Sequence, residues 1–284
     1  MQWSVGGLFF LWFTTRRREV GLGYGWLLRG TYLLMALGGF AAGVAFGFVP
    51  VRDISALLVA IAATVVLVVS VRRKAAGVSG AAAEHDRRSA RVAEMTGIDR
   101  TATVTAPADT EVGAGPEFPP VLDLVAPAIG LVGLIAAGID ASTGGAENMG
   151  VALLRTLTGA LFLGAVTDAM LLGHWYLVQP GLPRKHLNDL VRALGWVWPI
   201  EVVALLLPVG MIAVWTGEVD DGWNGTLGWF WAACAITTIV LVYVTKAALK
   251  ERYYSAVMAA TGLLYLAILT AFGTDLVARA VLAG

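Results

Sequence analysis

Long apolar runs separated by short polar segments cover most of the chain. Backbone amide and carbonyl groups find no water in the hydrocarbon core of a bilayer, so each must be hydrogen-bonded within its own segment. An apolar run of about 20 residues is then long enough to cross as one helix. The pattern predicts an all-α, polytopic transmembrane helix bundle with seven full spans, at residues 31–49, 54–71, 121–139, 151–178, 193–216, 227–246 and 254–281.

The N-terminal segment, residues 1–15, is also apolar but short for a full crossing. Two placements are open: an eighth span, or a re-entrant or interfacial helix. The segment is not a conventional signal peptide, because the positive charges of Arg16, Arg17 and Arg18 follow the apolar stretch instead of preceding it. If it spans, this cluster holds the residues that follow in the cytoplasm.

Basic residues are unequally divided between the two sets of loops, and positively charged loops stay on the cytoplasmic side of a membrane. Only Arg52, Arg155 and Arg279 fall on one side, whereas the other side holds 17 of the 20 Lys and Arg residues, in the loops 16–29, 72–100, 184–192 and 246–252. Much Ala, Val and Gly with more Arg than Lys is typical of a GC-rich bacterial genome. The sequence therefore predicts a multi-pass protein of the bacterial cytoplasmic (inner) membrane, with its C-terminus outside.

The one long polar stretch, residues 72–120, divides the chain. Its first half has the composition of a short amphipathic helix at 81–95, and its second half, rich in Thr, Ala, Gly and Pro, is typical of a linker. We expect membrane helices at 1–71, a cytoplasmic linker at 72–120 and a five-helix membrane bundle at 121–284.

Composition excludes several classes of protein. The chain is 58% apolar and 14% charged with no net charge, so no basic surface is available to bind nucleic acid. A single cysteine, Cys234, forms no intrachain disulfide, and no CxxC, HExxH or His/Cys cluster predicts a metal site. The expected partners are the lipid bilayer and either other membrane subunits or a second copy of the chain.

Three glycines four residues apart, Gly39, Gly43 and Gly47, predict a close helix–helix contact. Small residues let membrane helices approach closely along one face. The contact is either within one chain or between copies in a homo-oligomer.

Two carboxylates, Asp168 and Glu201, fall near the middle of predicted spans. An ionisable side chain at that depth is costly and marks a candidate functional site. The two spans follow one another and are antiparallel, so the carboxylates can face each other, with Thr167 beside them, and form a proton site. The alternative is that each acid is hydrogen-bonded singly and only sets the helix register.

A histidine, His174, lies in the run LLGHWYLVQP beside Trp175 and Tyr176, and His186 follows the next turn. Two imidazoles near one membrane surface are the ligands of a b-type haem, and the aromatic neighbours suit a quinone headgroup. The simpler interpretation is an interfacial histidine bonded to headgroups or nearby polar side chains.

Three functions remain open on the sequence alone. The first is a non-catalytic membrane subunit that anchors or scaffolds a larger complex, such as a respiratory or quinone-linked one. The second is a proton-coupled secondary transporter that uses Asp168 and Glu201. The third is a haem- or quinone-binding redox protein that uses His174.

Overall fold

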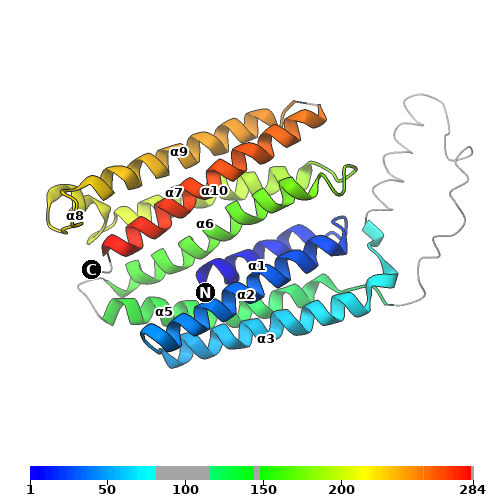
Figure 1. Cartoon of the computed structure of the whole chain (residues 1–284), viewed down its shortest axis with the longest axis horizontal. Helices are drawn as coiled ribbons and strands as arrows, with labels where there is room; N and C mark the ends of the chain where they lie inside the picture. Colours follow the sequence, from blue (N-terminus) through cyan, green and yellow to red (C-terminus); the bar gives the residue numbers. More distant parts are fainter. Residues whose placement is uncertain (81–115, 144–147, 252, 283–284) are drawn as a thin grey trace, which may run out of the picture.

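The computed structural model describes residues 1–80, 116–143, 148–251 and 253–282, which form one elongated bundle of helices (Figure 1). The predicted amphipathic helix at 81–95 lies outside the described residues. In chain order the elements are α1 (Gln2–Thr15), α2 (Leu22–Phe46), α3 (Pro50–Arg72), the 3₁₀ turns η1 (Lys74–Ala76) and η3 (Pro120–Leu124), α5 (Val125–Thr143), α6 (Met149–Trp175), α7 (Lys185–Leu206), α8 (Met211–Thr216), α9 (Thr226–Ala248) and α10 (Tyr254–Leu282).

In the part of the chain that the structure describes, six helical segments are long and apolar enough to cross a membrane: α2, α3, η3 with α5, α6, α9 and α10. This supports the predicted all-α, multi-pass membrane bundle. The predicted seven full spans with a possible eighth are not confirmed. The two segments outside the set are α1, which at 14 residues is only about 21 Å long, and α7, which carries four charged side chains.

The predicted span 193–216 is interrupted in the structure. Helix α7 begins earlier, at Lys185, and ends at Leu206, and the chain becomes helical again only in α8. Pro208 lacks the amide hydrogen that would continue the helix, and its ring clashes with the preceding turn. The apolar run is therefore a helix, a break and a six-residue helix.

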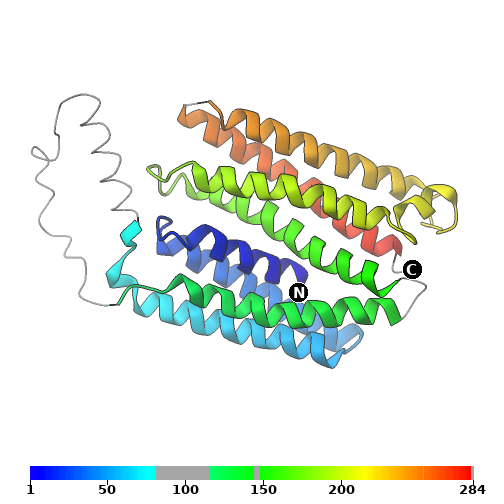
Figure 2. The ribbon, with the colours of Figure 1, turned by 180° about the vertical axis from the view of Figure 1, so that it is seen from behind.

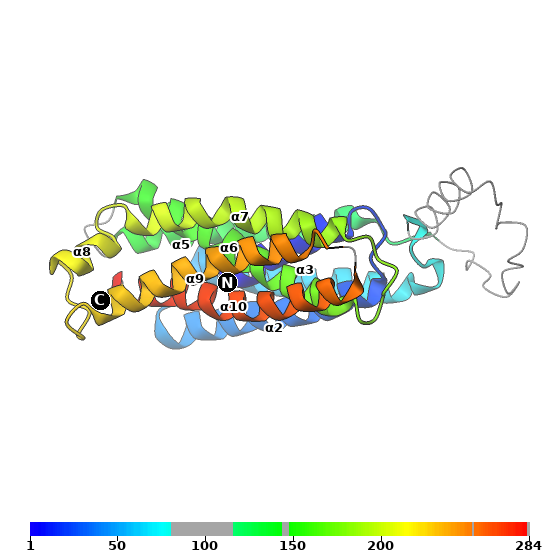
Figure 3. The same ribbon diagram turned by 90° about the horizontal axis from the view of Figure 1, so that it is seen from above.

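The connections divide between the two ends of the bundle (Figures 1 and 3). The α1–α2, α6–α7 and α9–α10 connections and η1 lie at one end, which we call the arginine end. The α2–α3 connection, the last turn of α5, the first turn of α6 and α8 lie at the opposite end, which we call the Asp140 end. For the residues that the structure describes, this is the grouping of loops used in the count of basic residues.

Helix α6 is the centre of the bundle. It contacts α1, α5, α7 and α10, and of the six apolar segments it is the most buried. From behind, α1, α2, α3 and α5 lie on one side of it and α7, α9 and α10 on the other (Figure 2). The outer helices expose large apolar side chains, such as Leu34, Val132 and Leu269, as expected of surfaces in contact with lipid.

The N-terminal helix α1 lies inside the bundle, against α2, α5 and α6. It extends from the middle of the bundle, where Met1 lies, to the arginine end (Figure 1). Glycines allow this position: a Cβ on Gly6 would overlap with the Ala160 carbonyl of α6, and a Cβ on Gly164 would lie 2.7 Å from the backbone nitrogen of Gly7. The backbones of α1 and α6 therefore touch through these glycines.

The three glycines singled out in the sequence have different surroundings. A Cβ on Gly39 would lie 3.0 Å from the Met1 nitrogen, and one on Gly43 would overlap with the Asp53 carboxylate of α3. Gly47 follows the end of α2, and no atom lies within 4 Å of its added Cβ. Two of the three thus face close neighbours within the chain.

We expect Gly6→Ala to lower the free energy of unfolding by about 1–3 kcal/mol, because the added methyl group forces α1 away from a rigid backbone carbonyl. Thermal unfolding in detergent measures the change. Gly38→Ala is the matched control: it adds the same methyl group to α2 with no atom within 4 Å and should not lower stability. Equal behaviour of the two variants would contradict the close α1–α6 contact.

Candidate functional site

Glu201, near the end of α7, is completely buried in the bundle. Its Oε2 atom accepts a hydrogen bond from the Thr158 hydroxyl of α6. Its Oε1 atom has no hydrogen-bond partner in the described part of the chain. A buried carboxylate oxygen without a partner is costly, so Glu201 is a candidate functional group.

Charged residues of α6 and α10 surround Glu201. Arg279 Nε donates to Asp275 Oδ1 at 2.8 Å, and Arg279 Nη2 donates to the Arg155 carbonyl oxygen at 3.0 Å. The Arg279, Asp275 and Glu201 side chains all lie next to Gly159. A Cβ added at Gly159 would overlap with the Arg279 guanidinium, and it would lie 2.8 Å from Asp275 Oδ1 and 3.4 Å from Glu201 Oε1. We call Arg155, Thr158, Glu201, Asp275 and Arg279 the Glu201 cluster.

Arg155 connects this cluster to the break after α7. Because Pro208 has no amide hydrogen, the Ala204 carbonyl lacks its helical partner. Arg155 Nε donates to this carbonyl at 2.9 Å, and Nη2 donates to the carbonyls of Leu207 and Val209 at 2.8 and 2.9 Å. A cation here also suits the negative end of the α7 dipole.

An arginine near the end of a span commonly extends its side chain to lipid phosphates at the membrane surface. Arg155 does not, since it is buried and its guanidinium binds the carbonyls around the break. This role could not be predicted from the sequence, because Arg155 and the carbonyl of Ala204 lie 49 residues apart.

Asp168 and Glu201 do not form a pair. Glu201 bonds to Thr158, and Asp168 lies ten residues further along α6, a separation of about 15 Å at 1.5 Å per residue. The prediction of equal depth assumed a helix start at residue 193. Since α7 starts at Lys185, Glu201 lies in its last turns, toward the Asp140 end.

Asp168 has its own partners on α2. The Tyr32 hydroxyl donates to Asp168 Oδ1, and the Tyr24 hydroxyl donates to the Asp168 carbonyl oxygen at 3.4 Å. The neighbouring Thr167 is not part of this arrangement: its hydroxyl accepts from Trp3 Nε1 at 2.7 Å and donates to the Leu163 carbonyl. Thr167 therefore connects α6 to α1.

The two histidines have different partners. His174 is exposed on α6, with the Tyr265 ring edge-on at a centroid distance of 6.4 Å. His186 is buried, with Nε2 2.7 Å from Glu19 Oε2, and Lys185 Nζ lies 2.8 Å from Glu19 Oε1. This arrangement does not fit a haem held by both imidazoles, because His186 Nε2 is bound to Glu19.

Glu19 is the acid that binds both Lys185 and His186 at the arginine end. Burial alone would raise the pKa of Glu19, but the hydrogen bonds from Lys185 and His186 outweigh it, so the pKa lies below its usual value. The group is therefore ionised at neutral pH and ties the α1–α2 connection to the start of α7.

The aromatic residues proposed to flank a quinone also bond within the protein. Trp175 Nε1 donates to Gln179 Oε1 at 3.2 Å, and the Tyr176 hydroxyl donates to the Pro183 carbonyl at 2.7 Å. Both bonds close the turn between α6 and α7. They give these side chains a structural role at the arginine end.

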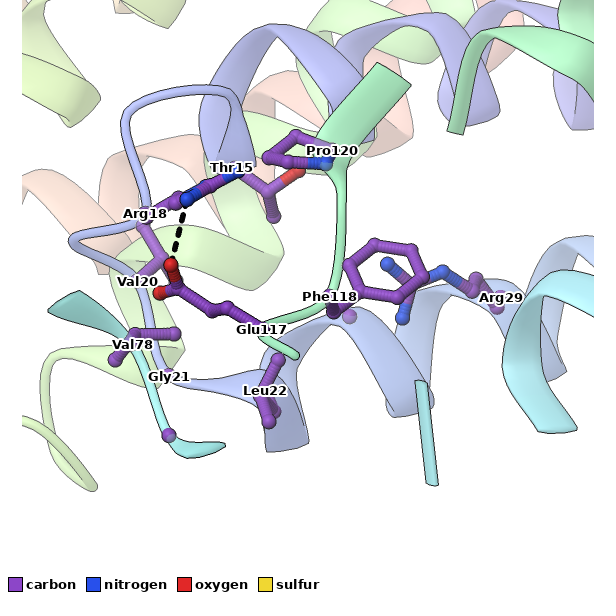
Figure 4. A pocket seen from close by; sticks show the side chains of 12 residues that line it. Thr15, Arg18, Val20, Gly21, Leu22, Arg29, Val78, Glu117, Phe118 and Pro120 are labelled. Atoms are coloured by element: carbon purple, nitrogen blue, oxygen red, sulfur yellow. Dashed lines mark hydrogen bonds and ion pairs between the residues drawn. The ribbon is translucent and has the colours of Figure 1, made fainter. Parts of the chain in front are cut away.

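A buried ion pair that sequence reasoning missed joins α2 to η3. Arg29 Nε and Nη2 donate to the two oxygens of Asp123 at 2.7 and 2.8 Å, and each side chain is only 2% exposed. Arg29 also donates to Ser70 and stacks on the Phe118 ring (Figure 4). Arg29 had been assigned to a loop because the apolar run was taken to begin at residue 31.

The cavity beside this pair is small. It has a volume of about 20 Å³, and the more exposed Arg18–Glu117 ion pair closes its other side (Figure 4). Such a volume holds about one water molecule. The Arg29–Asp123 pair therefore has a structural role and connects α2 to η3. The Glu201 cluster and Asp168 remain the candidate functional sites.

Comparisons with protein-family models, curated proteins and solved structures found no match to this chain. The assignment of function therefore depends on the site geometry alone.

We expect Asp123→Asn to destabilise the protein by about 3–5 kcal/mol, because it leaves the Arg29 charge buried without a counter-charge. Replacing both partners, as in R29M/D123L, should restore much of that loss in a thermal unfolding assay. Arg18→Gln serves as the control, since that side chain is 40% exposed and such pairs contribute about 0–1 kcal/mol. A double variant no more stable than Asp123→Asn would argue against the pair.

We expect Arg155→Met to loosen the break, because at least three carbonyls lose a donor and each unsatisfied buried group costs about 1–3 kcal/mol. Hydrogen–deuterium exchange of residues 205–216 should accelerate, while exchange in α3 stays the same. Arg192→Met is the comparison, because Arg192 is exposed. Unchanged exchange around the break would show that Arg155 does not hold it.

Proposed function

We propose that this integral membrane protein is a proton-coupled carrier in which Glu201 is the acid that binds the coupling proton. The observation that supports the proposal is the carboxylate oxygen of Glu201, which is buried among charged residues next to a broken helix and has no partner among the described residues. Discontinuous helices whose ends face the substrate or the coupling ion are typical of the binding sites of secondary transporters.

A change of charge at Glu201 has a direct route to the helix break. Ionised Glu201 attracts Arg279, whose guanidinium is shared between Asp275 and the Arg155 carbonyl. When Glu201 is neutral, this attraction is lost and Asp275 is the carboxylate that binds Arg279. Arg155, in turn, holds the carbonyls on both sides of Pro208. Protonation therefore alters the balance of charges that positions α8 relative to α7, which is what coupling to a conformational change requires.

In the proposed orientation in the membrane, the arginine end lies in the cytoplasm, because basic loops are retained there. The Glu201 cluster then lies in the outer half of the bilayer. The alternative of a scaffolding subunit assigns Glu201 a purely structural role, and the two hypotheses differ in whether its proton exchanges.

The test measures proton binding without requiring the cargo to be known. In proteoliposomes on a solid-supported membrane, a pH step should produce a transient current in the wild type. The charge moved should fall at least several-fold in Glu201→Gln and persist in part in Glu201→Asp. The matched control is Glu218→Gln, which removes an exposed acid near the same end and should behave as the wild type.

A current of wild-type size in folded Glu201→Gln would overturn the proposal and favour the scaffolding subunit. Substrate-induced currents from a panel of amino acids, sugars and organic acids, recorded under a proton gradient, then identify the cargo in the wild type. These currents should be absent in Glu201→Gln.

A further inference from the structure

We propose that Asp168 is a second proton-binding site inside the bilayer, separate from the Glu201 cluster, where the carboxyl group is buried without a cation as the neutral acid and accepts a hydrogen bond from Tyr32. Its proton binding stands on the geometry of Asp168 alone. Its participation in transport rests on the proposed carrier function.

The buried acids differ in whether a cation is bonded to them. Four of the six buried acids in the described part of the chain are bonded directly to a cation: Glu19 to Lys185, Asp53 to Arg52, Asp123 to Arg29 and Asp275 to Arg279. Asp168 and Glu201 are not. Glu201 still has Arg279 and Arg155 within electrostatic range. Asp168 is the buried acid whose carboxyl group meets no cation.

The surroundings of Asp168 are neutral on every element packed against it. From α2 it faces the hydroxyl groups of Tyr24 and Tyr32. From α1 come Trp3, which binds the adjacent Thr167, and Gly7, which packs on the Tyr32 ring. In the described ranges, α7 and α10 bring no charged side chain into hydrogen-bonding contact with it.

An ionised Asp168 would therefore be a lone charge in a low-dielectric interior, and the neutral acid is the form that such a site accommodates. The hydrogen bonds specify where the proton resides. Tyr32 donates to Oδ1, which must then be the accepting oxygen, whereas Oδ2 is completely buried without a partner. The neutral acid therefore carries its proton on Oδ2.

The position of Asp168 indicates the side with which it exchanges protons. Tyr24 lies in the first turn of α2 at the arginine end, and Tyr32 lies two turns deeper on the same helix. Asp168 therefore lies nearer to the arginine end than to the Asp140 end. About 15 Å along α6 separates Asp168 from Thr158 in the Glu201 cluster, too far for direct proton transfer. Asp168 thus lies nearer to the arginine end and Glu201 nearer to the Asp140 end.

The test uses infrared spectroscopy of the full chain in lipid vesicles, where a protonated carboxyl group gives a C=O stretching band that a carboxylate lacks. We expect Asp168→Asn to remove one such band at neutral pH and Glu201→Gln to leave that band in place. Tyr32→Phe should move the same band to higher wavenumber, because the carbonyl oxygen loses a hydrogen bond.

The outcomes separate this inference from the carrier hypothesis. A spectrum of Asp168→Asn that retains every carboxylic-acid band would show that Asp168 is ionised and would overturn the inference, even if the Glu201-dependent current persists. The band with no such current would leave Asp168 as a proton site and reject the carrier. If Asp168→Asn does not fold, Tyr32→Phe decides: an unshifted set of bands overturns the proposal.

Discussion

Every polar group that the chain places in the bilayer needs a partner from the protein, because the hydrocarbon core supplies none. Arg29 and Arg155 satisfy this constraint in different ways. Arg29 binds a carboxylate from a segment far away in sequence, which neutralises its charge and closes the arginine end. Arg155 binds carbonyls that the end of α7 leaves without donors. Arg29 therefore joins two segments through an ion pair, whereas Arg155 caps a helix break.

The same constraint explains how a 14-residue helix occupies the interior. Lipid provides little hydrophobic drive for one helix to pack on another, so α1 is stabilised by close van der Waals contact and by polar bonds. Gly6 and Gly164 allow backbone contact with α6. At the mid-bundle end of α1, Gln2 donates to the Thr156 carbonyl and Ser4 to the Tyr32 carbonyl. Protein on several sides thus replaces the bilayer as the surroundings of α1.

Sequence reasoning predicted the helices where length and hydropathy decide, as in α3, α6, α9 and α10, and it identified both unusual acids. It failed where a tertiary contact decides. Arg29 and Asp123 are far apart in sequence, so no local pattern shows that an apparent loop arginine belongs inside α2. A proline inside an apolar run can bend a helix or end it, so Pro208 alone did not place the break after α7. The predicted start of this span at residue 193, in place of Lys185, shifted the expected depth of Glu201 and suggested a pairing with Asp168 that the structure does not show.

The placement of acids gives the bundle two kinds of buried carboxyl group. Those bonded to arginine or lysine are satisfied as ion pairs. Asp168 and Glu201 each keep one oxygen without a partner, and stability alone offers no reason for this, since an apolar side chain would fill the same space at lower cost. A carboxyl group without a cation bonded to it can gain and lose a proton without breaking an ion pair. The unpartnered oxygens of Asp168 on α6 and Glu201 on α7 therefore suit the proposed proton exchange better than a purely structural role.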